Sequence, residues 1–228
     1  MTDTSPSRPP ADGYLSSARV EAFSDGVLAI AITLLVLDLV VPSRATAAEH
    51  GLARALAEEW PSYLAYLVSF VVIGIIWVNH HTVFTKVHRV DRPVLFANLL
   101  VLLTVSLLPF PTRLLAEYLT AGDDSHVAAA VYSATMLVMG LSFALLWWTI
   151  TRDARLLHEH LDAAGNRATL RRFAVGNVFY LITVGLSFAS AIGALAVHAA
   201  LAVYYCFDQL ATPGGPAPSA RPAPEGRP

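Results

Sequence analysis

The segment RVEAFSDGVLAIAITLLVLDLVV, residues 19–41, places a short polar group directly before a long apolar one. The polar group contains four hydrophilic side chains, which are Arg19, Glu21, Ser24 and Asp25. From residue 27 to residue 41 the only charged side chain is Asp38. About 20 apolar residues in an α-helix cross the hydrocarbon core of a bilayer. The segment therefore predicts a transmembrane helix with a polar entrance.

The composition of the whole chain has the same character. Of its 228 residues, 55% are apolar and only 14% are charged, and the mean hydropathy is +0.55. The apolar fraction and the mean hydropathy are higher, and the charged fraction is lower, than those of a soluble domain of this size, which indicates an all-α integral membrane protein. The net charge is −2 and the basic residues are dispersed, which argues against a nucleic-acid partner. The single cysteine, Cys206, excludes an intrachain disulfide.

Further apolar segments follow the first one along the chain. The last of them, residues 173–207, contains no formally charged side chain and would be about 52 Å long as one helix, which suits two spans better than one. The small residues of SFASAIG, residues 187–193, would permit the turn between them. We therefore predict six transmembrane helices, at about 18–41, 61–84, 93–119, 126–150, 171–188 and 191–209.

The distribution of Lys and Arg predicts the orientation of these helices. With both termini in the cytoplasm, the exterior keeps only Arg44, Arg54 and Arg113 of the 15 basic residues, as the positive-inside rule requires. The exterior loops are instead acidic, with Glu49, Glu58, Glu59, Glu117, Asp123 and Asp124. Residues 1–16 and the Pro-, Ala- and Gly-rich residues 211–228 are expected to be disordered, because neither segment can bury enough apolar surface to offset ordering. Residues 17–210 then form the transmembrane domain.

Polar side chains recur at one depth in the first three predicted helices. Asp25 would lie about 7 to 10 Å from the cytoplasmic end, where an unpaired carboxylate costs several kcal/mol. The second helix runs inward and brings WVNHH, residues 77–81, to a similar depth, and the third helix brings Asn98 there. We therefore predict a buried polar network between helices. Its members are Ser24, Asp25, Trp77, Asn79, His80, His81 and Asn98.

These residues carry a resemblance to a known family. RVEAFSDG matches the R-x-x-x-F-S-D signature of the transmembrane protein 175 potassium channel family, and WVNHH and LLPFPT (residues 107–112) extend the resemblance. The signature residues are Arg19, Phe23, Ser24 and Asp25, and the six-span layout widens the match to roughly residues 17–210. The resemblance implies a potassium-preferring cation channel with the first helix of each subunit lining the pore. Since this chain holds one six-span unit, the resemblance further implies a prokaryotic homotetramer in the cell membrane, with potassium ions and lipid as partners.

The resemblance also implies where the pore constriction lies. The chain has no T-V-G-Y-G filter, and similar proteins use apolar side chains of the first helix as a hydrophobic gate. Steps of four and three residues from Phe23 define one stripe along that helix, formed by Ile30, Thr33, Leu34 and Leu37. Four copies of Ile30 and Leu37 would form apolar rings, with the Thr33 hydroxyls between them. From the residues alone, the same stripe is equally typical of interhelical packing.

Two other classes of function stay open at this point. A secondary transporter would show internal repeats and helices broken near the midplane, whereas the prolines that interrupt a span here, Pro109 and Pro111, lie near its outer end. A membrane-embedded haem or metal oxidoreductase would use His80, His81 and His198. Adjacent histidines on a helix point about 100° apart and are a poor pair for one metal ion. We expect no cofactor, no bound metal and no enzymatic activity.

Overall fold

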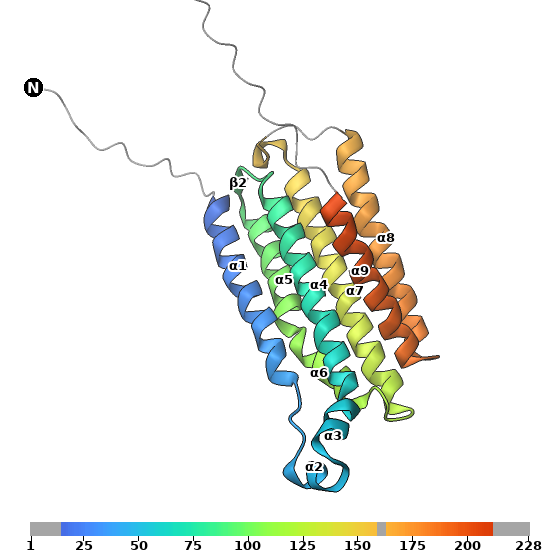
Figure 1. Cartoon of the computed structure of the whole chain (residues 1–228). Helices are drawn as coiled ribbons and strands as arrows, with labels where there is room; N and C mark the ends of the chain where they lie inside the picture. The colour runs from blue at the N-terminus through green and yellow to red at the C-terminus, as the bar shows by residue number, and fades with distance from the viewer. Residues whose placement is uncertain (1–14, 159–162, 212–228) are drawn as a thin grey trace, which may run out of the picture.

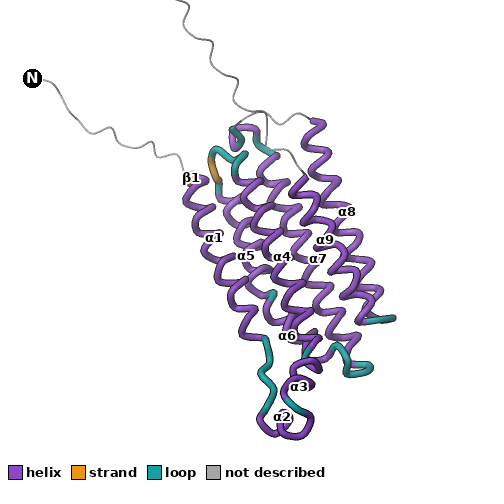
Figure 2. Tube along the Cα trace, viewed as in Figure 1, coloured by secondary structure: helices purple, strands orange, loops and turns teal. Residues whose placement is uncertain are grey.

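The computed structural model describes residues 15–158 and 163–211, which form a bundle of long helices (Figure 1). The long helices are α1 (Ser17–Leu34), α4 (Trp60–Phe84), α5 (Arg92–Leu107), α7 (Asp124–Thr151), α8 (Ala163–Ser187) and α9 (Ala191–Ala211). The shorter helices are α2 (Arg44–His50), α3 (Leu52–Glu58) and α6 (Pro109–Tyr118), with 3₁₀ turns η1 (Leu35–Asp38) and η2 (Ala154–Leu156). The helix-coloured tube in Figure 2 runs almost without interruption through the bundle, and α2 and α3 project beyond one end of it.

Within the described residues, four helical segments are long and apolar enough to cross a membrane. They are Ser17–Asp38, Trp60–Phe84, Arg92–Tyr118 and Asp124–Thr151. The prediction of a helical membrane protein is confirmed for these four segments. The apolar part of α9, Ala191–Cys206, is shorter. Helices α8 and α9 occupy the places of the fifth and sixth predicted spans.

The structure differs in detail from three of the predicted spans, although the predicted span at 93–119 agrees with Arg92–Tyr118. The first helix was expected to reach residue 41, but α1 ends at Leu34, η1 ends at Asp38, and Leu39 is extended. Pro42 disfavours a helix that continues through residue 41, because proline lacks an N–H group and disfavours helical geometry in the residue before it, and the helical geometry ends three residues earlier, at Asp38. The third helix, expected at 93–119, is divided into α5 and α6 at Leu108, directly before Pro109.

The third difference is the start of α8, which lies at Ala163, before the predicted start of the fifth span at about 171. Residues 163–170 form the first part of this helix, but their sequence is too polar to be found by a search for apolar segments. The boundary at residue 16 was also wrong, since Leu15 and Ser16 form strand β1 (Leu15–Ser16), which pairs with β2 (Arg89–Val90). The other residues expected to be disordered, 1–14 and 212–228, lie outside the described part of the chain.

The β1–β2 pair marks the end of the bundle opposite α2 and α3 (Figure 1). Asp91 begins α5 there by accepting a hydrogen bond from Val94 N at 3.0 Å, and it also pairs with Arg152 Nη2 at 2.6 Å. The ion pair ties the start of α5 to the end of α7. On the predicted orientation, this end faces the cytoplasm.

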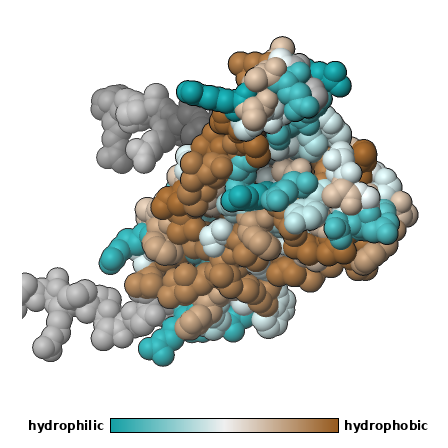
Figure 3. All heavy atoms as spheres, turned by 90° about the horizontal axis from the view of Figure 1, so that it is seen from below, coloured by the Kyte–Doolittle hydropathy of each residue, from teal (hydrophilic) through white to brown (hydrophobic). Residues whose placement is uncertain are grey.

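The bundle keeps many large apolar side chains exposed on its sides. Figure 3, which looks at the molecule from the end that carries α2 and α3, shows hydrophobic surface beside polar residues. Phe96 and Leu103 of α5 and Leu181 of α8 are each at least 60% exposed. Exposed apolar area of this extent indicates contact with lipid or with another protein chain.

The interior is apolar with a few paired hydroxyl groups. Tyr132 of α7 is completely buried, and its hydroxyl lies 3.0 Å from Ser69 Oγ of α4. Ser69 Oγ also lies 2.7 Å from Thr112 Oγ1 of α6. One serine therefore joins three helices in a part of the bundle without access to water.

Ser69→Ala is expected to destabilise the bundle, because it leaves the buried Tyr132 hydroxyl without its partner. The expected loss is about 1–3 kcal/mol of unfolding free energy, measured by denaturant unfolding in detergent. In the double variant Ser69→Ala/Tyr132→Phe the orphaned hydroxyl is gone, so the loss should be smaller than the sum of the two single losses. If the two single losses of unfolding free energy simply added up in the double variant, the hydrogen bond between Ser69 and Tyr132 would not contribute to stability.

Candidate functional site

Helix α1 has two distinct faces. The buried face is formed by residues three or four positions apart, which are Val20, Ser24, Leu28 and Ala31. The opposite face is open to the surroundings of the single chain, with Ile30 at 61%, Leu34 at 42% and Leu37 at 73% exposure. The stripe predicted from the sequence therefore lies on a surface that the rest of this subunit does not cover.

The stripe stays straight although the α-helical geometry stops at Leu34. In a 3₁₀ helix, side chains three residues apart eclipse each other, so Leu37 in η1 lies in line with Leu34. The Thr33 hydroxyl is directed at its own helix and lies 2.9 Å from both Ala29 O and Ile30 O. Its proton is thus engaged, and its oxygen keeps lone pairs for an outside partner.

Asn98 of α5 is the centre of the buried contacts behind α1. Its amide Nδ2 donates to Ser24 Oγ at 2.9 Å, and its Oδ1 lies 2.8 Å from His80 Nε2 of α4. Since an amide oxygen only accepts, His80 Nε2 carries the proton in this pair. Ser24, His80 and Asn98 are all fully buried. The three side chains connect α1, α5 and α4 away from water.

Two further contacts join α1 and α4 in a regular series. Trp77 Nε1 donates to Asp25 Oδ1 at 3.1 Å, and His81 Nδ1 lies 2.7 Å from Glu21 Oε1. The helices are antiparallel, so one turn backward on α1, from residue 25 to 21, matches one turn forward on α4, from 77 to 81. Glu21 was missed by the sequence reasoning, although its position one turn before Asp25 was the available signal.

Asn79 lies on another side of α4 than Trp77 and His81 do. Asn79 was predicted to belong to the interhelical network, and the structure places it on the wall of a cavity of about 190 Å³ between α4, α7, α8 and α9. Two positions along an α-helix correspond to a rotation of about 200°, so Asn79 and Trp77 lie on nearly opposite sides of α4. The same cavity is lined by Lys86, whose Nζ lies 5.4 Å from the ring centre of Trp147.

The histidines that a haem or metal oxidoreductase would use lie in separate environments. His80 bonds Asn98, His81 bonds Glu21, and His198 Nε2 lies 3.0 Å from Ser133 Oγ. His198 also packs against Tyr132 and Tyr180, with ring centres 5.2 and 5.8 Å apart. In the described part of the chain, no group of three or more His, Cys, Asp or Glu side chains is placed to hold a metal ion.

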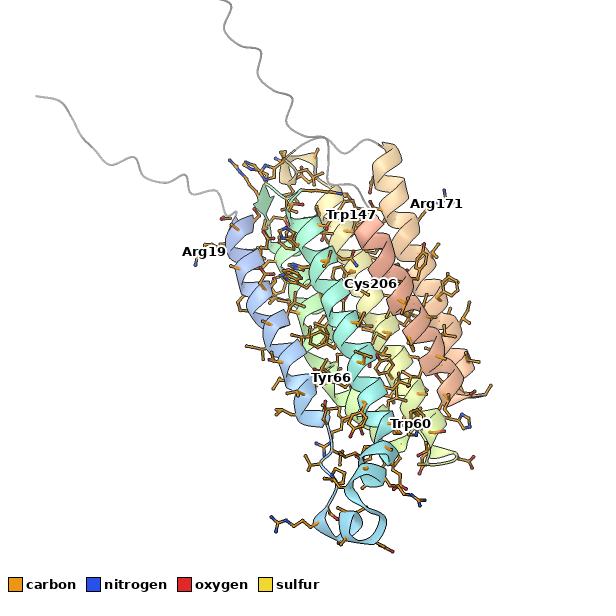
Figure 4. All side chains as sticks on the ribbon, viewed as in Figure 1. Arg19, Trp60, Tyr66, Trp147, Arg171 and Cys206 are labelled. Atoms are coloured by element: carbon orange, nitrogen blue, oxygen red, sulfur yellow. The ribbon has the colours of Figure 1, made fainter. Side chains whose placement is uncertain are left out.

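The signature residues divide between the two faces of α1. Ser24 and Asp25 make the interhelical contacts described above, whereas Phe23 is 58% exposed and Arg19 points away from the bundle (Figure 4). Figure 4 also shows Arg19 and Arg171 toward the end of the bundle that carries the β1–β2 pair, and Trp60 toward the other end. That other end has a hollow of about 450 Å³ whose charged lining residues are Asp38, Glu58, Glu59, Arg113 and Glu117.

Comparison with known proteins matches this arrangement to one family. The family profile described as "Endosomal/lysosomal potassium channel TMEM175" matches residues 19–109, which include the stripe on α1 and the network behind it. A potassium channel of Streptomyces collinus is 56% identical over 86% of this chain and 95% of its own length. The chain belongs to the TMEM175 potassium channel family.

Two other members of the TMEM175 family extend the comparison. The crystal structure of a lysosomal potassium-selective channel TMEM175 homologue from Chamaesiphon minutus is 40% identical, covers 85% of this chain and 97% of its own, and has a TM-score of 0.77. The human relative is named an endosomal/lysosomal proton channel and is 32% identical over 90% of this chain. This chain covers only 46% of the human protein.

Proposed function

We propose that this protein is the subunit of a potassium-preferring channel that conducts ions passively across the cell membrane. Its 56% identity to a protein named a potassium channel supports this function. The observation in the molecule itself is the exposed stripe of Ile30, Leu34 and Leu37 on α1, whose other face is locked to α4 and α5. Such a face contacts lipid or another chain, and we place it on a pore axis shared by several copies.

The proposed assembly is a homotetramer with both termini in the cytoplasm and six spans per subunit. Helices α8 and α9 run along the bundle beside α7 and supply the fifth and sixth spans (Figure 1). Around the central axis, four copies of Ile30 and of Leu37 form apolar rings, and four copies of Thr33 lie between them. The transmembrane channel domain then extends over residues 17–210.

The proposed rings select ions through the free energy of dehydration. A narrow apolar ring opposes the entry of water, so an ion must give up part of its hydration shell to pass. Potassium gives up hydration water more easily than sodium does. The Thr33 oxygens, whose protons are engaged within the helix, offer replacement ligands at this point.

The buried contacts of α1 have a structural role in this proposal. Ser24, His80 and Asn98, together with the Asp25–Trp77 and Glu21–His81 contacts, hold α1 against α4 and α5. These contacts set the rotation of α1 about its own axis and thus the direction of the stripe. The signature sequence is therefore proposed to position the pore-lining face instead of contacting ions.

Ion flux from liposomes that contain the purified protein tests the function. A potassium gradient alone should drive flux, sodium should pass more slowly, and the current should reverse near the potassium equilibrium potential. Flux that requires a second ion gradient would favour the secondary transporter. Because the human relative is named a proton channel, proton flux is measured in the same liposomes. Proton flux without potassium flux would contradict the proposal and indicate a proton channel.

A further inference from the structure

Two histidines that are far apart in the sequence meet at the β1–β2 end of the bundle. His88 lies between α4 and β2, and His158 follows η2. Their segments run antiparallel, with His88 N donating to Leu156 O at 2.7 Å and His158 N donating to Lys86 O at 3.0 Å. Val87 and Leu157 form the bridge between these two hydrogen bonds. The backbone therefore fixes both histidines on one short two-stranded platform.

The two imidazole rings lie side by side and both histidines are exposed to solvent. Their centres are 4.8 Å apart and their planes are inclined by 61°. When two imidazoles bind one zinc ion tetrahedrally, each Zn–N bond is about 2.0–2.1 Å long, which puts the ring centres about 5 Å apart. The observed separation of the ring centres is therefore compatible with both rings binding one ion once a nitrogen of each ring turns toward it.

We propose that His88 and His158 form a binding site for a divalent transition metal ion, with Zn²⁺ as the probe. Imidazole nitrogen favours zinc, copper and nickel over magnesium and calcium, which prefer oxygen ligands. Within residues 15–158 and 163–211, no group of three or more His, Cys, Asp or Glu side chains is placed to hold a metal ion, so the proposed site has two protein ligands from this part of the chain. Arg155, the nearest basic residue before His158 in the sequence, is held by Asp153 at 2.8 Å. That pairing lowers the pKa of the Asp153 carboxyl and offsets the positive charge of Arg155.

A metal ion at this site would connect the segment after α4 to the segment after α7. Val87 and Leu156, which belong to the two paired segments, are fully buried. The metal ion would therefore join two segments that are anchored in the core. An ion that binds the folded protein and not the unfolded chain stabilises the fold by mass action. Zinc is therefore expected to raise the melting temperature in proportion to the logarithm of its concentration.

The experiment uses the full chain in detergent, purified without a polyhistidine tag. Zinc binding is followed by calorimetric titration and by thermal melting, with magnesium as the comparison ion. We expect one zinc site per subunit that magnesium does not fill. His88→Gln and His158→Gln should each weaken zinc binding by about 100-fold, because the second imidazole binds intramolecularly to an ion already held by the first.

His50→Gln is the matched control, because His50 ends α2 at the opposite end of the bundle. It should leave zinc affinity unchanged. His158→Cys should keep the site, since a thiolate is also a zinc ligand, which separates loss of a ligand from failure to fold. Zinc binding that survives either Gln variant, equal binding of magnesium, or loss of binding in His50→Gln would overturn the proposal.

Discussion

Ile30→Asn is expected to increase the current through the channel and to let sodium pass nearly as well as potassium. Ile30 is 61% exposed on the uncovered face of α1, and the proposed ring of four copies is the narrowest apolar constriction. An amide side chain hydrates this ring, so dewetting and partial dehydration no longer oppose entry. We expect sodium permeation to rise about tenfold, which corresponds to about 1.4 kcal/mol of barrier. Reversal potentials and currents in planar bilayers provide the measurement.

Variants of neighbouring residues on α1 make this result specific. Leu37→Asn should act in the same direction more mildly, because it lies nearer the outer mouth, and Thr33→Val should reduce the preference for potassium. Ile32 packs against the core of its own subunit, so Ile32→Asn should reduce folding yield without widening the pore. Unchanged permeation in both Ile30→Asn and Leu37→Asn would remove α1 from the pore and favour the secondary transporter.

Asn98→Ala is expected to cause a large loss of stability and to weaken assembly. The substitution removes both the donor to Ser24 Oγ and the acceptor for His80 Nε2, and both partners are fully buried. Each buried polar group without a partner costs about 1–3 kcal/mol, so the loss should exceed that of Asp25→Ala, whose carboxylate is only partly buried. Melting temperature and oligomer size in detergent should both fall.

Ser106→Ala is the control on the same helix. Ser106 is exposed and its hydroxyl bonds only Leu103 O of its own helix, so the melting temperature should change little. If Asn98→Ala or Asp25→Ala kept a fully stable oligomer and changed only ion selectivity, the network would belong to the permeation path. The structural role proposed for the signature sequence would then be wrong.

The sequence by itself determined the membrane class and much of the helical layout, because hydropathy depends on residue type and not on contacts. Length and apolar content were enough to locate the four confirmed spans. The depth argument that grouped Asp25 with Trp77 and Asn98 required only the rise per residue and the direction of each helix. The position of Pro109 could also have located the end of α5, since the effect of a proline on the backbone is local.

Only the tertiary structure decided which side chains meet. Depth along a helix is readable from the sequence, but the rotation of each helix depends on all its neighbours at once. This is why the depth argument did not separate Asn79, which lines the cavity beside α7, α8 and α9, from Trp77, and why it left Glu21 without its contact to His81. His88 and His158 show the same limit, because nothing local relates two loop residues that become neighbours only when α4 and α7 pack together and their ends form a short antiparallel bridge.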